Sequence, residues 1–282
     1  MATWIQNTDV PIVFGSGVRE QLLYNDKFYI VGGQGALSNK TISYDTTSNS
    51  YDTTLSDMDR RQNCAGAISG STIFVFGGYG TMYTCVKYEI LTDTWSSIHN
   101  MPAPKEYAGA ARLGNFIYIF GSQHGNRILK YDIAGDTWTV QVQTYDGMNY
   151  SAVTVGNYIY IFGGDQHLND VKKYDPINDV WITSPTLTPI PGTWFKNGNA
   201  FVHGTNVYLL GGIYAKTRFL QYDTVSNNWT TLPNIPYDKV AGTGGIPESG
   251  NIYIMGGGGY SNLEYSLIDP GDINPYKSRI QG

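Results

Sequence analysis

The sequence predicts an all-β fold, a six-bladed β-propeller whose blades each contain four antiparallel strands. Three observations predict it. An apolar segment ending in glycine recurs six times, a tyrosine follows each copy, and short runs of alternating apolar and polar residues are separated by turn residues. A regular period of about 45 residues along nearly the whole chain is typical of proteins built from structural repeats.

The recurring segment reads FYIVGG, IFVFGG, IYIFGS, IYIFGG, VYLLGG and IYIMGG along the chain. The first glycines of the copies are Gly32, Gly77, Gly121, Gly163, Gly211 and Gly256, which are 45, 44, 42, 48 and 45 residues apart. β-Branched and aromatic residues that stop at glycine are typical of a strand that ends where the backbone bends without room for a Cβ atom. We therefore expect one repeated unit per copy, with small loop insertions.

Aromatic residues stand at a constant place in each unit. The tyrosines are Tyr44, Tyr88, Tyr131, Tyr174, Tyr222 and Tyr265, and seven residues after the first five stand Tyr51, Trp95, Trp138, Trp181 and Trp229. We expect these large flat side chains to fill the space between neighbouring twisted sheets. The Asp or Asn between them is expected to cap the turn that joins the third and fourth strands.

The third unit shows the expected order of elements. Residues 108–113 form a first strand, Gly114-Asn115 a tight turn, and residues 116–120 a second strand. Residues 128–132 form a third strand and residues 138–143 a fourth. Four antiparallel strands per unit correspond to one propeller blade.

A glycine doublet followed by a tyrosine and then a tryptophan, repeated six times, resembles the kelch repeat of β-propellers. The resemblance covers roughly Thr3 to Asp269. Two copies depart from the pattern, because the third has Gly121-Ser122 in place of the doublet and the first has Tyr51 in place of tryptophan. These departures affect single blades and leave the fold class unchanged.

The sixth copy lacks a tryptophan after Tyr265, and the missing strand is expected at the N-terminus. Residues 3–6 (TWIQ) are similar to residues 94–97 (TWSS) of the second copy. We predict that this N-terminal strand completes the last blade and closes the ring, as is common in kelch propellers. The expected organisation is one propeller over residues 1–268 and a C-terminal tail over residues 269–282.

Composition excludes several function classes. Charged residues make up only 15% of the chain and the net charge is −5, so the positive field that attracts phosphate backbones is missing and no nucleic acid is expected. No apolar run reaches the length of a membrane span, and Met1 to Val10 does not resemble a signal peptide. Cys64 and Cys85 form no metal-binding or disulfide pattern. The location stays open, with a virion or the cytoplasm most consistent.

Motifs for chemistry are absent. The sequence contains no HExxH, GxSxG, P-loop or EF-hand pattern, and we assign no catalytic residue, metal or cofactor. His124 and His167 follow the glycine ends of adjacent units and lie on one rim of the ring, where they could approach one another. With Asp165 they form a possible metal site, but spacing fixes no third ligand. If the protein were an enzyme, Glu106, Asp165 and His167 would be its acid-base candidates.

The kelch resemblance implies that the loops joining the second to the third strand, and those joining one blade to the next, share one face that holds the ligand. The residues expected on this face combine aromatic rings with amides and few charges. They are Gln34, Arg60, Arg61, Asn63, Tyr79, Tyr107, His124, Tyr150, Asp165, His167, Trp194, Tyr214 and Tyr260.

This combination suits neutral sugars, which stack on aromatic rings and hydrogen-bond to amides, and it suits a protein partner almost equally well. The sequence thus favours a non-catalytic recognition or structural module that binds a glycan or a protein. The composition also fits a component of a larger assembly, such as the surface of a virus or phage. The alternative is a sugar-modifying kelch enzyme resembling the sialic acid mutarotases. A copper-radical oxidase does not fit, because the required tyrosine–cysteine set cannot be placed.

Overall fold

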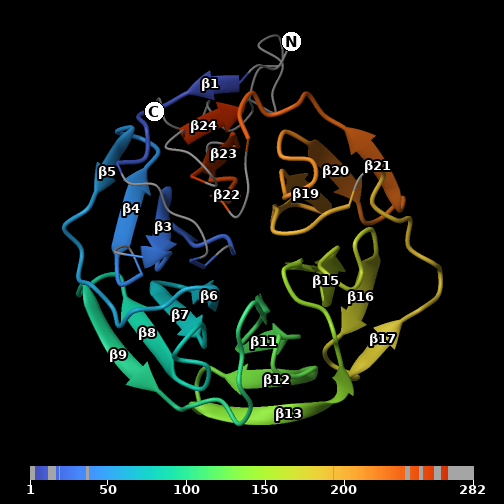
Figure 1. Cartoon of the computed structure of the whole chain (residues 1–282), viewed down its shortest axis with the longest axis horizontal. Helices are drawn as coiled ribbons and strands as arrows, with labels where there is room; N and C mark the ends of the chain where they lie inside the picture. Colours follow the sequence, from blue (N-terminus) through green and yellow to red (C-terminus); the bar gives the residue numbers. More distant parts are fainter. Residues whose placement is uncertain are drawn as a thin grey trace, which may run out of the picture.

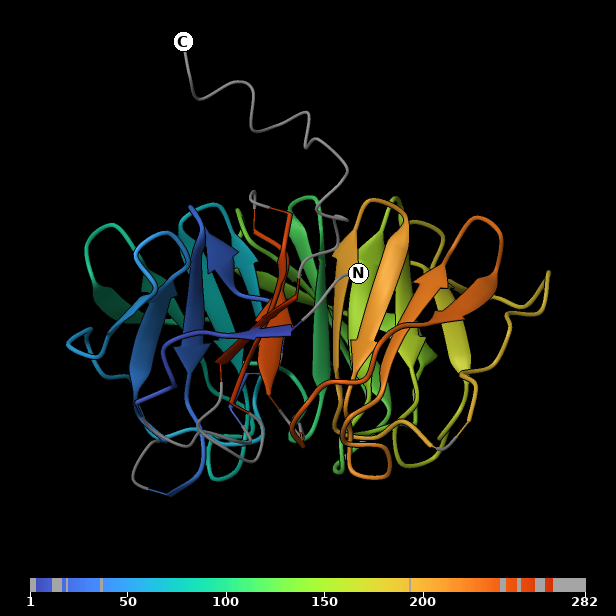
Figure 2. The same ribbon diagram turned by 90° about the horizontal axis from the view of Figure 1, so that it is seen from above.

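The computed structural model describes residues 4–11, 17–18, 20–35, 38–192, 194–238, 242–247, 250–256 and 262–265. These residues form strands and no helix. The strands are arranged as six four-stranded sheets around a central axis (Figure 1), and they run between the two rims of a disc (Figure 2). The predicted all-β propeller with four-stranded antiparallel blades is confirmed. The expected tail, residues 269–282, lies outside the described residues.

We number the blades in chain order, from the innermost strand of each blade outward. Blade 1 contains β2 (Leu23–Tyr24), β3 (Lys27–Val31), β4 (Thr41–Asp45) and β5 (Ser50–Asp52). Blade 2 contains β6 (Ala65–Ser69), β7 (Thr72–Phe76), β8 (Cys85–Glu89) and β9 (Thr94–Ile98). Blade 3 contains β10 (Gly109–Leu113), β11 (Phe116–Phe120), β12 (Arg127–Asp132) and β13 (Thr137–Thr144).

Blade 4 contains β14 (Ser151–Val155), β15 (Tyr158–Phe162), β16 (Val171–Asp175) and β17 (Val180–Ile182). Blade 5 contains β18 (Asn199–His203), β19 (Asn206–Leu210), β20 (Phe219–Asp223) and β21 (Asn228–Thr231). The remaining sheet contains β22 (Thr243–Gly245), β23 (Ile252–Met255), β24 (Asn262–Tyr265) and β1 (Trp4–Gln6). The strands of blade 3 agree with the sequence prediction to within one or two residues.

Aromatic side chains form the core between blades. Phe76, at the end of the second strand of blade 2, contacts Tyr131 of blade 3 at a centroid distance of 5.7 Å and Trp138 at 5.5 Å, both edge to face. Phe120 contacts Tyr174 of blade 4 in the same geometry, at 5.5 Å. The predicted packing of the repeated Tyr and Trp between neighbouring sheets is therefore confirmed. Such edge-to-face pairs bury a large apolar area, and they also place the positive edge of one ring against the negative face of the other.

Hydrogen bonds of the same Tyr and Trp side chains accompany the aromatic contacts between blades. The Tyr174 hydroxyl donates to Asp179 Oδ1 at 2.6 Å, and Asp179 Oδ2 accepts the Val142 amide of blade 3 at 2.6 Å. The Trp181 indole donates to the Thr144 carbonyl at 3.1 Å. The Tyr residues of blades 1, 2, 3 and 5 make the equivalent bond to Asn49, Asp93, Asp136 and Asn227. In blades 1, 3, 4 and 5 the aspartate that directly follows the Tyr caps the turn as predicted, as Asp132 does for Ala134. In blade 2 this residue is Glu89.

The N-terminal strand lies beside the last strand of the sixth sheet. β1 pairs antiparallel with β24, with Trp4 opposite Tyr265 and Gln6 opposite Leu263. The Trp4 ring contacts Phe219 of blade 5 at 5.5 Å. Thr8 donates its amide to Asn49 of blade 1 at 2.9 Å. The segment therefore contacts the blades on both sides of the sixth sheet, and its contribution to stability stays a prediction.

Candidate functional site

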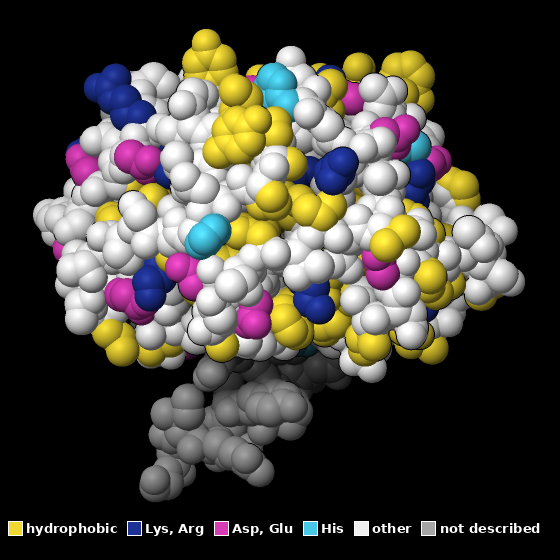
Figure 3. All heavy atoms as spheres, turned by 90° about the horizontal axis from the view of Figure 1, so that it is seen from below, with side chains coloured by type: hydrophobic (Ala, Val, Ile, Leu, Met, Phe, Trp, Pro, Cys, Tyr) yellow, Lys and Arg dark blue, Asp and Glu magenta, His cyan; other side chains and the backbone are white. Residues whose placement is uncertain are grey.

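The candidate site is the rim that carries two kinds of connection, which we call the loop face. In a four-stranded antiparallel blade, the connection between the second and third strands and the connection to the next blade leave the sheet at the same rim. On the loop face the former connections include residues 77–84, 121–126, 163–170 and 211–218, and the latter include residues 53–64, 99–108, 145–150 and 183–198. Figure 3 shows the disc from its side, where backbone and uncharged polar side chains cover most of the surface and hydrophobic and charged side chains are scattered among them.

The glycine doublets set how closely neighbouring blades approach at the loop face. Gly77 has φ of +61°, and a Cβ atom added to it would lie 2.2 Å from the Lys105 carbonyl oxygen at the entrance of blade 3. The next residue, Gly78, donates its amide to that same carbonyl at 2.9 Å. Gly163 has the same relation to Phe195, with a Cβ-to-oxygen distance of 2.1 Å. The doublet is therefore required because a carbonyl of the next blade occupies the side-chain position.

Serine replaces the second glycine in blade 3 and contributes a side-chain contact. The Ser122 hydroxyl accepts the Glu106 amide at 3.0 Å and the His124 amide at 3.1 Å. This departure from the repeat therefore ties the blade entrance to the loop that carries His124.

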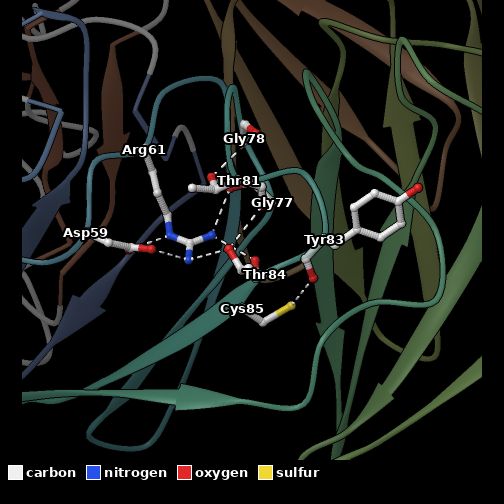
Figure 4. Close-up of polar contacts among 8 residues, drawn as sticks. All are labelled: Asp59, Arg61, Gly77, Gly78, Thr81, Tyr83, Thr84 and Cys85. Carbon is white, nitrogen blue, oxygen red and sulfur yellow. Dashed lines mark hydrogen bonds and ion pairs between the residues drawn. The ribbon is translucent and has the colours of Figure 1, made fainter.

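A buried arginine holds the loop of blade 2 (Figure 4). The Arg61 side chain has no exposed surface, and its guanidinium binds both carboxylate oxygens of Asp59 at 2.7 Å. Nη1 donates to the Gly77 carbonyl at 3.0 Å and to the Thr84 carbonyl at 2.8 Å, which are the two ends of the loop. Planar, charge-assisted donors make these bonds strong and directional. The loop between these ends presents Tyr79 and Tyr83, whose exposed fractions are 63% and 49%.

Lys105 holds the loop of blade 3 in the same way. It is 1% exposed, and its ammonium group donates to the Gly121 carbonyl at 2.7 Å and to the Arg127 carbonyl at 2.5 Å. Arg61 and Lys105 each precede the first glycine of their own blade by 16 residues. This repeated spacing of buried cations is visible in the sequence but was not recognised there. Burial lowers the pKa of Lys105 to about 7.

The low pKa of Lys105 predicts a pH dependence of stability. In the unfolded chain the amine has its ordinary pKa of about 10.4, so above pH 7 the unfolded state holds a proton that the native state has released. The free energy of unfolding must then rise with pH across this window. From pH 7 to pH 9 we expect wild type to gain about 2 kcal/mol relative to Lys105→Met in chemical denaturation.

Lys87→Met is the matched control for this experiment, because Lys87 is 37% exposed and pairs with Glu89 at the surface. Its pH profile should run parallel to that of wild type. Parallel profiles for Lys105→Met and wild type would contradict the assignment of Lys105.

Left-handed residues link the entrances of blades 2 to 5. Asn63, Tyr107, Asn149 and Asn197 have φ between +54° and +58°. Each of the last three donates its amide to the carbonyl of the one before, at 3.0, 3.1 and 2.9 Å. Asparagine tolerates this conformation, whereas for an aromatic residue such as Tyr107 it is uncommon. The chain of bonds fixes the positions of the side chains of Asn63 and Asn149.

Two carboxylates lie beside these asparagines. Glu106 is 5% exposed, and its carboxylate lies 3.2 Å from His124 Nε2 and accepts from the Asn63 amide at 3.4 Å. Asp165 repeats this arrangement in blade 4. Its carboxylate lies 2.7 Å from Lys196 Nζ and accepts from the Asn149 amide at 3.1 Å. Each carboxylate therefore lies beside one basic side chain and one amide.

His167 belongs to a different cluster. Its Nε2 lies 2.7 Å from Asp146 and its Nδ1 lies 3.1 Å from Asp170. The contact with His167 is the main reason that the pKa of Asp146 lies below its ordinary value. His124 and His167 thus pair with different carboxylates, and Asp165 pairs with Lys196. Within the described ranges, no group of three or more His, Cys, Asp or Glu side chains could hold a metal ion.

The exposed aromatic side chains gather on the loop face. Among the described residues, the aromatic side chains with about half or more of their surface exposed are Tyr79, Tyr83, Trp194, Tyr214 and Tyr237, and each lies in a connection of this face. The exposed aliphatic residues Leu91, Ile177 and Val225 lie in turns between third and fourth strands, on the opposite rim. Aromatic exposure of this kind is typical of a recognition surface.

The predicted face residues fall into four groups. Gln34, Arg60, Tyr79, His124, Trp194 and Tyr214 are exposed, and Asn63, Tyr107, Asp165 and His167 are partly exposed. Arg61 and Tyr150 are buried. Tyr260 lies outside the described residues.

The expected exposure of Arg61 and Tyr150 was wrong. Arg61 is buried because it binds both ends of the loop between β7 and β8. The Tyr150 hydroxyl accepts the Gly109 amide at 2.9 Å and donates to the Phe120 carbonyl. Alternation and loop position do not reveal which polar side chains turn inward to satisfy backbone groups.

Among the described residues, the inner strands enclose a small cavity at the central channel. Its volume is about 180 Å³, and residues of the inner strands β6, β10, β14 and β18 line it. Glu20 enters the channel from blade 1, where its carboxylate accepts the Ala110 amide at 2.8 Å and the Gly66 amide at 3.3 Å. A small-molecule pocket of a typical protein has a volume of about 300 to 1,000 Å³.

A search of the described segments for membrane spans finds no helix with the length and apolar character that a bilayer requires.

The repeated blades and the loop face define a β-propeller built from sequence repeats. A family model described as the KLHDC2/KLHL20/DRC7 Kelch-repeats domain matches residues 20–212, and the chain therefore belongs to the kelch-repeat family. A solved structure titled "Structure of YjhT" has a TM-score of 0.76 at 15% identity, covering 92% of this chain and 95% of that chain. This similarity shows a shared fold.

Two curated relatives match part of the chain. Kelch-like protein 23 of Mus musculus is 31% identical over 97 residues, and that of Homo sapiens is 30% identical over 97 residues. The alignments cover 33% of this chain and 17% of each relative.

Proposed function

We propose that the chain is a non-catalytic recognition module whose loop face binds a glycan or a protein. The main support is that the five most exposed aromatic side chains among the described residues all lie in loop-face connections. Buried cations hold two of the loops at both ends, which favours a face that is ordered before binding. The surface is rich in neutral polar residues, and membership of a viral or phage surface assembly is part of this proposal.

Binding on the face rather than in the channel is supported by the size of the central cavity. With Glu20 bound to two inner-strand amides, about 180 Å³ remains. A partner that lies across the rim needs no central pocket and gains the aromatic area directly.

Paired substitutions test the proposal. One double variant is Tyr79→Ala with Tyr83→Ala, another is Trp194→Ala with Tyr214→Ala, and the control is Leu91→Ala with Ile177→Ala on the opposite rim. The probes are an array of immobilised glycans and a displayed random-peptide library. We expect a binder whose affinity falls at least tenfold in one or both loop-face variants. Retained binding in both, with a loss in the control, would contradict the proposal.

A sugar-modifying enzyme is the second candidate, because one pair on the face has acid-base chemistry. Glu106 is only 5% exposed, and its carboxylate lies 3.2 Å from Nε2 of His124, whose side chain is 35% exposed. A carboxylate beside an imidazole can exchange a proton with a bound hydroxyl. Exchange of sugar anomers followed by NMR distinguishes the two functions. Acceleration that Glu106→Gln abolishes and Asp57→Asn leaves intact would favour the enzyme.

A further inference from the structure

Two aromatic side chains form a corner on the loop face between blades 4 and 5. Trp194 lies in the connection between these blades, and Tyr214 lies in the loop after β19. Their ring centroids are 5.3 Å apart, and the angle between the ring planes is 90°. Both residues are 49% exposed. The perpendicular arrangement leaves ring surface of both residues open to solvent.

The corner is held by backbone contacts. The Arg218 guanidinium donates to the Pro191 carbonyl at 2.8 Å and to the Trp194 carbonyl at 3.4 Å, and burial lowers its pKa. The Ile213 amide, next to Tyr214, donates to the Lys196 carbonyl at 2.9 Å. The backbone that carries both aromatic residues is therefore held before any ligand arrives, which limits the entropy lost on binding.

Polar groups of both kinds flank the corner. Lys196, two residues after Trp194, offers ammonium protons, and the Asp165 carboxylate beside it offers acceptor oxygens. Asn149 donates to this carboxylate, and its own Oδ1 is buried without a hydrogen-bond partner among the described residues. Donors and acceptors close together suit hydroxyl groups, which need both.

The charges of this sector already have partners. Lys196 pairs with Asp165 at 2.7 Å, Lys216 pairs with Asp238 at 3.1 Å, and Arg218 is engaged by carbonyl oxygens. A carboxylate or phosphate ligand would need one of these cations to leave its present partner. A neutral ligand needs no such exchange.

We propose that this corner binds a neutral sugar. One face of a pyranose ring stacks on Trp194 or Tyr214 while its hydroxyls hydrogen-bond to Asp165 and Lys196. This inference rests on the proposed function, since it names the ligand class of the same face. It also predicts that anionic sugars, including sialic acids, bind more weakly than neutral ones.

The indole resonances of the protein offer a direct test. Trp4, Trp95, Trp138, Trp181 and Trp229 donate their indole protons to carbonyls of neighbouring blades. Trp194 lies in a connection, and Trp194→Phe identifies its peak in a ¹H–¹⁵N spectrum. The probes are chitotriose, maltotriose, mannotriose and sialyllactose. We expect at least one neutral trisaccharide to shift the Trp194 peak and leave the other five in place.

Variants extend the test. Tyr214→Ala should weaken the neutral sugar about tenfold, whereas Leu91→Ala, on the opposite rim, should leave the affinity unchanged. Tighter binding of sialyllactose at Trp194, or no shift with any neutral probe, would overturn the inference. If a displayed peptide then shifts the Trp194 peak, recognition by the loop face still stands. If neither kind of probe depends on loop-face residues, both proposals fail.

Discussion

Gly77→Ala is expected to destabilise the protein by more than about 4 kcal/mol and to reduce its soluble yield sharply. The added methyl group would lie 2.2 Å from the Lys105 carbonyl oxygen, and the carbon of that carbonyl is 3.1 Å away. The obstacle is backbone of the next blade, which cannot move like a flexible side chain. The clash therefore forces blades 2 and 3 apart at the loop face, where their aromatic core begins.

Gly70→Ala is the matched control in the same blade. Gly70 has φ of +58°, close to the +61° of Gly77, but nothing lies within 4 Å of its added Cβ atom. Its free energy of unfolding should fall by only about 1 kcal/mol, the cost of placing alanine in the left-handed region. Chemical denaturation of both variants separates the two effects. Equal losses would show that backbone conformation, and not blade contact, explains the doublet.

Deletion of residues 1–8 is expected to lower the free energy of unfolding by about 3 to 6 kcal/mol. The melting temperature should fall by about 10 °C or more for a domain of this size. The deletion removes the ladder between β1 and β24, the contact of Trp4 with Phe219, and the bond from Thr8 to Asn49. It also leaves β24 as an open edge, which invites association between molecules.

Ile5→Ala is the control for the deletion, because Ile5 is 52% exposed and its loss leaves the strand in place. Its effect should stay within about 0.5 kcal/mol. Differential scanning calorimetry and light scattering measure stability and association together. An unchanged melting temperature after the deletion would show that the ring does not depend on this strand.

The loop face was only partly predictable. Tyr79, Trp194 and Tyr214 were predicted from their place after a glycine doublet or at a blade junction, and they are exposed there. Lys196 and Arg218 are absent from the predicted face, because their partners are a side chain of a neighbouring loop and backbone carbonyls. The contact of His124 with Glu106, both in blade 3, also depends on how the loop returns to the blade entrance.

The repeat, the strand order within a blade and the aromatic core could all be predicted from the sequence, because each depends on local spacing. Glycine marks the end of the second strand, and the alternation of apolar and polar residues indicates which face of a strand is buried. Asp and Asn residues mark the turn between the third and fourth strands. The tertiary structure alone decided which polar side chains turn inward. Arg61, Lys105 and Tyr150 are buried because backbone carbonyls or amides brought near them by blade packing need partners. These backbone groups need side-chain partners only where separate blades pack together. A local sequence pattern therefore cannot reveal which polar side chains are buried.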